Sequence, residues 1–219
     1  NEPLQGNFDG VGIQFQLFHD TILVVAAVPG GPSDKLGIQA GDKIITINGE
    51  DAFGKKVTNT YVMERLRGPK GTRVTVGIKR KGRKELIDYT ITRDKIPLNS
   101  VDATFMIQED IGYIKLTRFA RTSLQEVKES IAALKKQGMK NLILDLRNNS
   151  GGFLDIAIDL SDEFLPSDKL IVYTEGLRSP RMDFKATMRG SFEKGKLIVM
   201  VNESSASASE IVAGAVQDW

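Results

Sequence analysis

Two apolar runs flank the stretch Glu203-Ser204-Ser205-Ala206-Ser207-Ala208-Ser209-Glu210-Ile211. The run 197–201 before it predicts a buried strand, and the run 211–216 after it predicts a helix. A serine in such a turn has an exposed hydroxyl, and the free N–H groups of the helix start can bind an anion. A nucleophilic serine needs both features. On these residues alone, a simpler interpretation is favoured, in which the serines only cap the helix and fill the turn.

A second turn, which is rich in glycine, makes a nucleophilic serine the favoured interpretation. The strand-like run 141–146 ends in Arg147-Asn148-Asn149-Ser150-Gly151-Gly152, and a helical pattern begins at Phe153. Together, LILDLRNNSGG and the later LIVMVNESSASASEIVAGA resemble the C-terminal processing peptidases, also called tail-specific proteases. The resemblance implies a PDZ domain followed by a ClpP/crotonase-like core with a serine nucleophile and a lysine base. It covers nearly the whole chain.

Composition is compatible with this resemblance but is not specific to it. The chain has 219 residues, of which 41% are hydrophobic and 26% are charged, as expected for one or two globular domains. A net charge of +2, without a long basic block, gives no indication of nucleic-acid binding. The absence of cysteine excludes disulfides, a cysteine nucleophile and thiolate metal sites. No apolar run reaches membrane-spanning length, and the first residues do not form a signal peptide.

The first half has the pattern of a small β-rich module. Strands are predicted over residues 11–15, 23–28, 43–47, 72–80 and 85–92, with a helix over 58–66. Ser33 is predicted to cap a short helix that ends at Gly37. Together with the run PGGPSDKLGIQAGDKIITING, this order of elements favours a PDZ domain over residues 9–96, preceded by a leader of residues 1–8.

Gly10-Val11-Gly12-Ile13 resembles the carboxylate-binding loop of PDZ domains. Glycines let the backbone N–H groups turn toward a terminal carboxylate, and a peptide would add as a strand beside the helix 58–66. The alternative is that these residues form only core and turns. The predicted ligand is a protein or peptide with a free, apolar C-terminus. The peptide-binding residues would be Gly10, Val11, Gly12, Ile13, Val62 and Leu66.

The second half, residues 97–219, alternates strands with helices, so an α/β layer with a largely parallel sheet is expected. The chain as a whole is therefore α/β (α+β overall). Ser123 and Glu126 predict a capping box at the start of a helix that runs to Gly138. Residues 175–195, which include Arg178, Pro180, Arg181 and Arg189, are predicted to form a loop.

An imidazole is not the expected catalytic base, because a Ser-His-Asp triad would have to recruit the single histidine from the other half of the chain. His19, the single histidine, falls in the PDZ-like half, where it is expected to be a solvated loop side chain. A lysine with a lowered pKa can serve instead. The resemblance implies a lysine about two dozen residues after the serine, followed by a glutamine, and both positions would fall beyond Trp219. We therefore expect a piece of a longer protein, without peptidase activity by itself.

The resemblance places the nucleophile at Ser207, with Ser205 and Ser209 as turn and capping residues. The Ala208 N–H would be one oxyanion donor, and the turn Gly151-Gly152 would supply the other. Asn149-Ser150-Gly151-Gly152 also looks like the Ser-Gly-Gly of trypsin-like proteases. However, those need an all-β double barrel and an upstream histidine, so Ser150 is interpreted as structural although the family often has proline there.

The sequence therefore predicts a C-terminal processing serine peptidase with no metal and no organic cofactor. The resemblance implies a periplasmic or cell-envelope location, protein substrates and no nucleic acid, and it leaves homo-oligomerisation open. The alternative is a non-catalytic peptide-binding protein with a protease-like scaffold.

Overall fold

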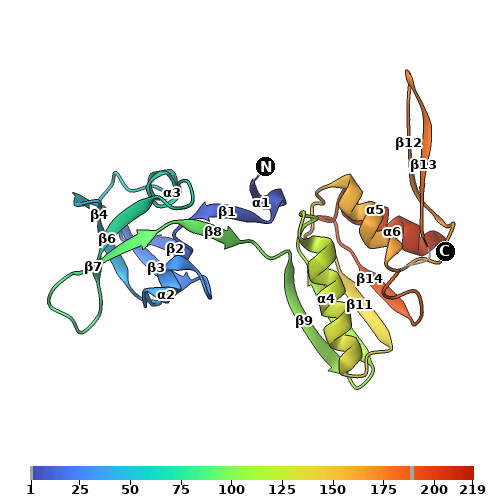
Figure 1. The fold of residues 1–219 in the computed structure, drawn as a ribbon, viewed down its shortest axis with the longest axis horizontal. Coiled ribbons are helices and arrows are strands. Elements are labelled where there is room, and N and C mark those ends of the chain that lie inside the picture. The colour runs from blue at the N-terminus through green and yellow to red at the C-terminus, as the bar shows by residue number, and fades with distance from the viewer. Residues whose placement is uncertain (1, 188–189) are drawn as a thin grey trace. The chain divides into compact units, whose positions relative to one another are not determined.

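The computed structural model describes residues 2–187 and 190–219, which form two compact units (Figure 1). The first unit is Asn7–Pro97. The second unit is Leu98–Trp219 together with the segment that ends at Gly6. The Gly6 carbonyl accepts a hydrogen bond from the Leu98 N–H at 2.8 Å, so the segment before Asn7 packs with the second unit.

The first unit is an antiparallel sheet of strand order β2-β3-β4-β6-β7, with the short strand β5 paired to β4. The strands that enter and leave the unit, β1 and β8, pair with each other. The elements are β1 (Asn7–Gly10), β2 (Ile13–Phe18), β3 (Thr21–Ala27), α2 (Pro32–Lys35), β4 (Lys43–Ile47), β5 (Glu50–Asp51), α3 (Asn59–Leu66), β6 (Arg73–Lys79), β7 (Ile87–Thr92) and β8 (Asp94–Pro97).

Local sequence explains the parts of this unit that matter for binding. Burial alternates along β2, as the period of two predicts. Helix α3 begins after Thr58, whose side chain accepts a hydrogen bond from the Tyr61 N–H at 3.1 Å. Val62 and Leu66 lie one turn apart on this helix and are buried in the core of the unit. The predicted strands and the helix of this half are therefore confirmed, with small differences at their ends.

The second unit contains a sheet of order β14-β11-β10-β9, in which β14, β11 and β10 are parallel and β9 is an antiparallel edge. Its elements are α1 (Glu2–Gln5), β9 (Val101–Gln108), β10 (Ile111–Leu116), α4 (Ser123–Lys136), β11 (Asn141–Asp145), α5 (Leu154–Asp162), β12 (Leu170–Gly176), β13 (Ser179–Lys185), β14 (Leu197–Met200) and α6 (Ala208–Asp218). One core joins α4, α5 and α6 to this sheet.

The register of this sheet brings two turns together. Asp145, the last residue of β11, lies opposite Met200, the last residue of β14. Since the two strands are parallel, the turns that follow them leave the same edge of the sheet. The first of these turns leads to α5 and the second to α6, so both the Gly-Gly turn and the serine-rich turn lie at this edge.

The loop predicted over 175–195 is wrong in part. Residues 179–185 form β13, which pairs with β12 in a hairpin that extends away from α5 and α6 (Figure 1). Most side chains of β13 are exposed. Pro180, Met182 and Phe184 do alternate with polar residues, but this short pattern begins with a proline and was interpreted as part of a loop. Pro180 lies near the start of this strand, where proline is tolerated. Arg189 lies outside the described residues.

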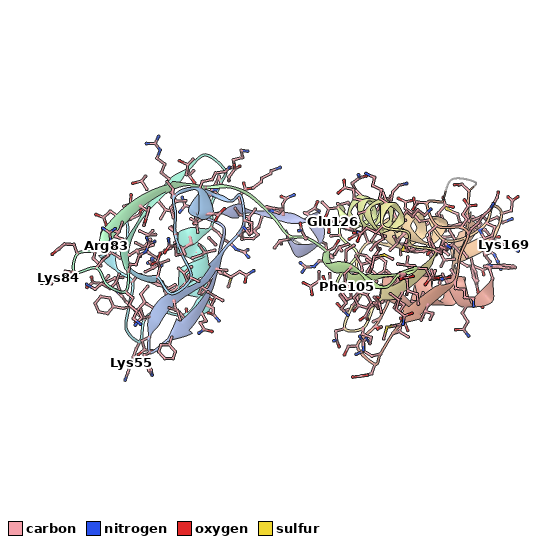
Figure 2. The ribbon with its side chains drawn as sticks, turned by 90° about the horizontal axis from the view of Figure 1, so that it is seen from below. Lys55, Arg83, Lys84, Phe105, Glu126 and Lys169 are labelled. Carbon is pink, nitrogen blue, oxygen red and sulfur yellow. The ribbon has the colours of Figure 1, made fainter. Side chains whose placement is uncertain are left out.

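The capping box predicted at Ser123 and Glu126 is also wrong. The N-cap of α4 is Thr122, and the Glu126 carboxylate instead accepts hydrogen bonds from the Ser100 and Val101 N–H groups at 2.7 and 2.9 Å. Figure 2 shows Glu126 on α4, in the second unit. The carboxylate therefore fixes the start of β9 to the helix, a long-range role that a local motif cannot reveal.

None of the helices in residues 2–187 and 190–219 is both long enough and apolar enough to cross a bilayer.

Candidate active site and peptide groove

Ser207 occupies a strained position at the start of α6. It is the N-cap of the helix, with φ 56° and ψ −113°, in a region that residues other than glycine rarely adopt. Its side chain is exposed, whereas the next two residues, Ala208 and Ser209, are buried. The Glu210 carboxylate accepts a hydrogen bond from the Ser207 N–H at 2.6 Å, which stabilises this backbone conformation. The turn thus presents one serine to solvent on a rigid support.

The two serines on either side of Ser207 have structural hydrogen bonds. Ser205 Oγ donates to the Leu146 carbonyl at 2.9 Å and accepts from the Asn202 N–H at the same distance. Ser209 is completely buried, and its Oγ donates to the Asn149 carbonyl at 2.8 Å. Both hydroxyls therefore connect the serine-rich turn to the turn that follows β11.

Gly151 lies in direct contact with the serine turn. A Cβ atom at this position would lie 2.9 Å from the Ala206 carbonyl oxygen and from Ser207 Cβ, and 3.0 Å from the Ala208 nitrogen. Its φ of +103° also excludes most other residues. At Gly152, an added Cβ would collide with the backbone of Phe119. Both glycines are thus required by the close approach of neighbouring backbone segments.

The hydrogen bonds of the glycine turn distinguish its two N–H groups. The Gly151 N–H donates to Asn149 Oδ1 at 2.9 Å. Among the described residues, the Gly152 N–H meets no hydrogen-bond acceptor. The Ala208 N–H belongs to the first residue of α6, where no carbonyl of the helix can accept it. Two unpaired N–H groups therefore lie close to the exposed serine.

Three asparagines support this arrangement, and sequence reasoning assigned a role to none of them. The side chains of Asn148 and Asn202 exchange a hydrogen bond at 2.9 Å, and Asn202 Oδ1 accepts from the Asn148 N–H at 2.8 Å. Asn149 is completely buried. Asn148 bonds to Asn202, 54 residues away, and Asn149 Nδ2 donates to the Leu116 carbonyl, 33 residues away, so no local signal could have identified these two contacts.

A buried carboxylate, that of Asp145, stabilises the end of β11, just before the glycine turn. Asp145 accepts hydrogen bonds from Tyr113 Oη at 2.6 Å, from Lys115 Nζ at 3.2 Å and from the Arg147 guanidinium at 2.7 Å. Burial alone would raise the pKa of the Asp145 carboxyl, but hydrogen bonds from Arg147, Tyr113 and Lys115 outweigh it and hold the pKa well below its usual range. An acidic residue within an apolar run was the available signal for this role.

The first unit contains a small apolar groove between β2 and α3. A cavity of about 110 Å³ lies there, with Arg67 at its margin as a cationic side chain. Five of the six residues predicted to bind a peptide line it, and the sixth, Gly10, forms a backbone bridge with Arg67. Sequence reasoning missed Phe8, Phe15, Met63 and Arg67. The lining residues are Phe8, Val11, Gly12, Ile13, Phe15, Val62, Met63, Leu66 and Arg67.

Ser33 holds the loop beside this groove. It is completely buried, and the Val11 carbonyl accepts hydrogen bonds from both Ser33 Oγ at 2.6 Å and the Ser33 N–H at 3.2 Å. Gly12 has a φ of +72°. The prediction of Ser33 as a helix cap is wrong, because Gly31 is the N-cap of α2 and the Ser33 hydroxyl turns to the loop instead.

Each of the two units matches a known protein family. Residues 110–219 match peptidase family S41, and residues 23–80 match the PDZ domain. The chain belongs to peptidase family S41. This result confirms the resemblance given by the two turns, and the mixed α/β fold with a β-rich PDZ domain is confirmed with it.

Several relatives share this architecture. The S41 chain is 35% identical over 218 residues to the carboxy-terminal processing protease CtpA of Bacillus subtilis, covering 100% of this chain and 46% of the relative. It is 35% identical to the carboxyl-terminal-processing protease of Synechocystis, covering 97% of this chain and 50% of the relative. A solved structure from Bacteroides fragilis assigned to the S41 proteases has a TM-score of 0.50 at 19% identity, covering 96% of this chain and 61% of that one, which shows likeness of fold alone. The chain thus spans about half the length of the curated relatives it matches.

The described residues of this S41 chain do not join Ser207 to an imidazole or an amine. His19 lies in the turn between β2 and β3, is exposed, and contacts Phe18 in a tilted arrangement with the ring centroids 4.1 Å apart. No hydrogen bond connects Ser207 with a lysine in residues 2–187 and 190–219. Lys115, the lysine bound at the end of β11, is held by Asp145.

Proposed function

We propose that this chain is the PDZ domain and the nucleophile-bearing part of a serine peptidase that acts on proteins with apolar C-termini. The observation that carries the proposal is the position of Ser207: an exposed hydroxyl at the strained start of a helix, next to two unpaired N–H groups. The hydroxyls of Ser205 and Ser209 are committed to carbonyls of the second unit, which supports Ser207 over its neighbours.

The chemistry is acyl transfer through a covalent intermediate. Ser207 Oγ forms a bond to the scissile carbonyl carbon while its proton passes to a neutral lysine amine. The negative charge on the carbonyl oxygen is stabilised by the Ala208 N–H and by an N–H of the Gly151-Gly152 turn. The C–N bond then breaks, the leaving amine takes the proton, and water hydrolyses the acyl-enzyme. The proposed lysine lies beyond Trp219 in the complete protein, so residues 1–219 alone are expected to be inactive.

The groove of the PDZ domain selects the substrate. A free carboxylate would bind the backbone N–H groups of the Gly10–Ile13 loop, and the last side chain would enter the 110 Å³ cavity. Apart from Arg67 and the backbone of Gly12, this cavity is lined by aliphatic, aromatic and thioether side chains, which favours an apolar terminal residue. Capture by the groove would raise the local concentration of the tail near Ser207. The mechanism uses no metal or organic cofactor, and an extracytoplasmic location stays a prediction from the family.

The test uses the complete gene product, the Ser207→Ala variant and the Ser204→Ala variant as a matched control. Ser204 is also exposed but lies outside the helix start. An unfolded protein with an apolar C-terminus is the substrate, and the same protein ending in two aspartates tests the groove. Mass spectrometry follows cleavage. We expect cleavage by the wild type and by Ser204→Ala, none by Ser207→Ala, and slower cleavage of the acidic tail.

Each result has a clear meaning. Equal cleavage by Ser207→Ala would place the nucleophile elsewhere. Binding of the apolar tail without cleavage by any variant would instead support the peptide-binding alternative, in which the second unit is a scaffold. Equal cleavage of both tails would contradict the role proposed for the PDZ groove while leaving the nucleophile intact.

A further inference from the structure

Asn149 uses its side chain to join two parts of the second unit. It is completely buried, its Nδ2 donates to the Leu116 carbonyl at 3.0 Å, and its Oδ1 accepts from the Gly151 N–H at 2.9 Å. Because a carbonyl can only accept and an N–H can only donate, these partners fix the orientation of the amide. The side chain therefore has one arrangement, which ties the glycine turn to the end of β10.

The backbone carbonyl of the same residue holds the other turn. It accepts a hydrogen bond from the Ala206 N–H at 3.2 Å and one from Ser209 Oγ at 2.8 Å. These donors lie immediately before and two residues after Ser207 in the chain. One buried residue thus connects the end of β10, the glycine turn and both sides of the exposed serine.

The direction of the peptide planes adds a second observation. The Gly151 carbonyl accepts a hydrogen bond from the Phe119 N–H at 3.0 Å. In a trans peptide the C=O and N–H point in opposite directions, so the Gly152 N–H points away from Phe119. The bond from Gly151 to Asn149 Oδ1 removes the Gly151 N–H as a donor, which leaves Gly152 as the available donor of this turn.

We infer that Asn149 is the positioning residue of the active site, which withdraws the Gly151 N–H and holds the Gly152 and Ala208 N–H groups as the pair that binds the oxyanion. This inference rests on the proposed function of Ser207. Asn149 touches neither substrate nor reacting atoms. Its effect on the reaction comes through the backbone segments that it holds.

A purely structural asparagine would predict a different result. The loss of its hydrogen bonds would then lower the stability of the second unit, and the folded enzyme would keep its turnover rate. A positioning residue changes kcat because the donors lose their alignment with the oxyanion, while KM, which reflects tail capture and ground-state binding, changes little.

Asn141 provides a matched control. Its amide also joins two segments, with Nδ2 donating to Asp110 at 3.0 Å and Oδ1 accepting from the Lys196 N–H at 3.1 Å. It is the first residue of β11, at the opposite end of the strand from the glycine turn. The Asn141→Ala variant therefore loses the same kinds of hydrogen bond without touching the proposed site.

The experiment compares kcat, KM and the urea midpoint of the complete gene product with those of Asn149→Ala and Asn141→Ala. We expect both variants to have lower urea midpoints. We expect Asn149→Ala alone to lose about 100-fold in kcat, with KM within about threefold of the wild type. An unchanged kcat in Asn149→Ala, or an equal loss in both variants, would overturn the inference. Full activity of Ser207→Ala would instead refute the proposed function, so the two failures are distinguishable.

Ser209→Ala keeps the test decisive if Asn149→Ala does not fold. This variant removes only the hydroxyl that donates to the Asn149 carbonyl, and the Ala206 N–H still satisfies that oxygen. We expect a kcat about 3- to 10-fold lower, since the connection between the two turns becomes looser. A kcat within twofold of the wild type would overturn the positioning role.

Discussion

The two units contain two glycine loops for which we propose binding of a negatively charged oxygen by backbone N–H groups, and the two loops are built differently. In the first unit, the Gly10–Ile13 loop borders an apolar cavity, and a serine hydroxyl and its own N–H hold the Val11 carbonyl. In the second unit, the Gly151-Gly152 turn is packed against the backbone of Ser207 and Ala208, and the amide of Asn149 holds it. The first loop is open on one side, whereas the second turn is enclosed by backbone.

This difference matches the tasks that we propose for the two loops. Reversible capture of a peptide tail depends on the sum of many contacts, so a small displacement of the loop costs only part of the affinity. Stabilisation of an oxyanion depends on donors held at hydrogen-bond distance from a transient charge, so the same displacement costs a large part of the rate. The strained φ of 56° at Ser207 is tolerated only because the surrounding turn fixes it.

The largest effect is expected for Gly151→Ala. The new Cβ would press on backbone atoms of Ala206 and Ala208, which cannot move without moving Ser207. We expect kcat to fall by about 10²- to 10³-fold, as for loss of an oxyanion donor. Turnover of a peptide substrate by the complete gene product measures this.

Gly12→Ala is the matched change in the other loop. There the new Cβ would meet the end of the flexible Ile96 side chain at 2.9 Å, so the cost comes mainly from the positive φ, about 1 kcal/mol. We expect peptide affinity to fall by less than about tenfold, with kcat at saturating substrate unchanged. If Gly151→Ala retained turnover to the same degree, the contrast between the loops would be wrong.

An intermediate effect is expected for Asp145→Asn, which removes the charged carboxylate at the end of β11. The change weakens the hydrogen bonds beside the Gly151-Gly152 turn and leaves the Gly10–Ile13 loop unchanged. The carboxylate is buried, and its pKa is held well below the usual range, so its stabilisation is fully present above the pKa of an unfolded aspartate, ~3.9. It is lost as the pH falls from there toward the folded-state pKa. We expect the variant to lose about 2 kcal/mol in unfolding free energy at pH 7, a moderate value because Arg147 is half-exposed.

Urea unfolding at pH 7 and at pH 3 checks this sign. The difference between wild type and Asp145→Asn should shrink at pH 3, because the wild-type carboxyl then begins to lose its stabilising charge relative to the unfolded chain. An equal difference at both pH values would show that the ionised carboxylate contributes little. The peptide affinity of the first unit should not change at pH 7.

The sequence predicted the elements whose pattern is local. The alternation of apolar residues along β2 and the two helices α3 and α4 each come from neighbours in the chain, and the structure contains all three. The exposed hairpin strand β13 was missed because its short alternation of Pro180, Met182 and Phe184 with polar residues lies in a segment that is otherwise largely polar. The glycines of the two loops could be recognised because a special backbone conformation excludes other residues.

The side chains that hold these loops could not be predicted in the same way. Asn149 bonds to Leu116, 33 residues earlier, and Ser33 bonds to Val11, 22 residues earlier. Asparagine and serine are ordinary turn and cap residues, so their local sequence suggests local roles. Only the fold decides whether such a side chain turns to its own helix or to a distant loop. The assignment of Ser207, Ala208 and the groove residues to their roles stays a prediction that the experiments above test.

The smallest effect is expected for Ser33→Ala, which removes one of the two donors to the Val11 carbonyl. The N–H of residue 33 remains as a partner, so the loss is that of a single buried hydrogen bond, about 1 kcal/mol, or about fivefold in affinity for an apolar C-terminal peptide. Ser161→Ala is the control, since Ser161 is equally buried and its hydroxyl donates to the Ala157 carbonyl within α5. Titration of a fluorescent peptide should detect weaker binding in Ser33→Ala alone. Equal affinity in both variants would mean that the backbone N–H suffices to hold the loop, and the two loops would then differ in their packing and not in the side chains that support them.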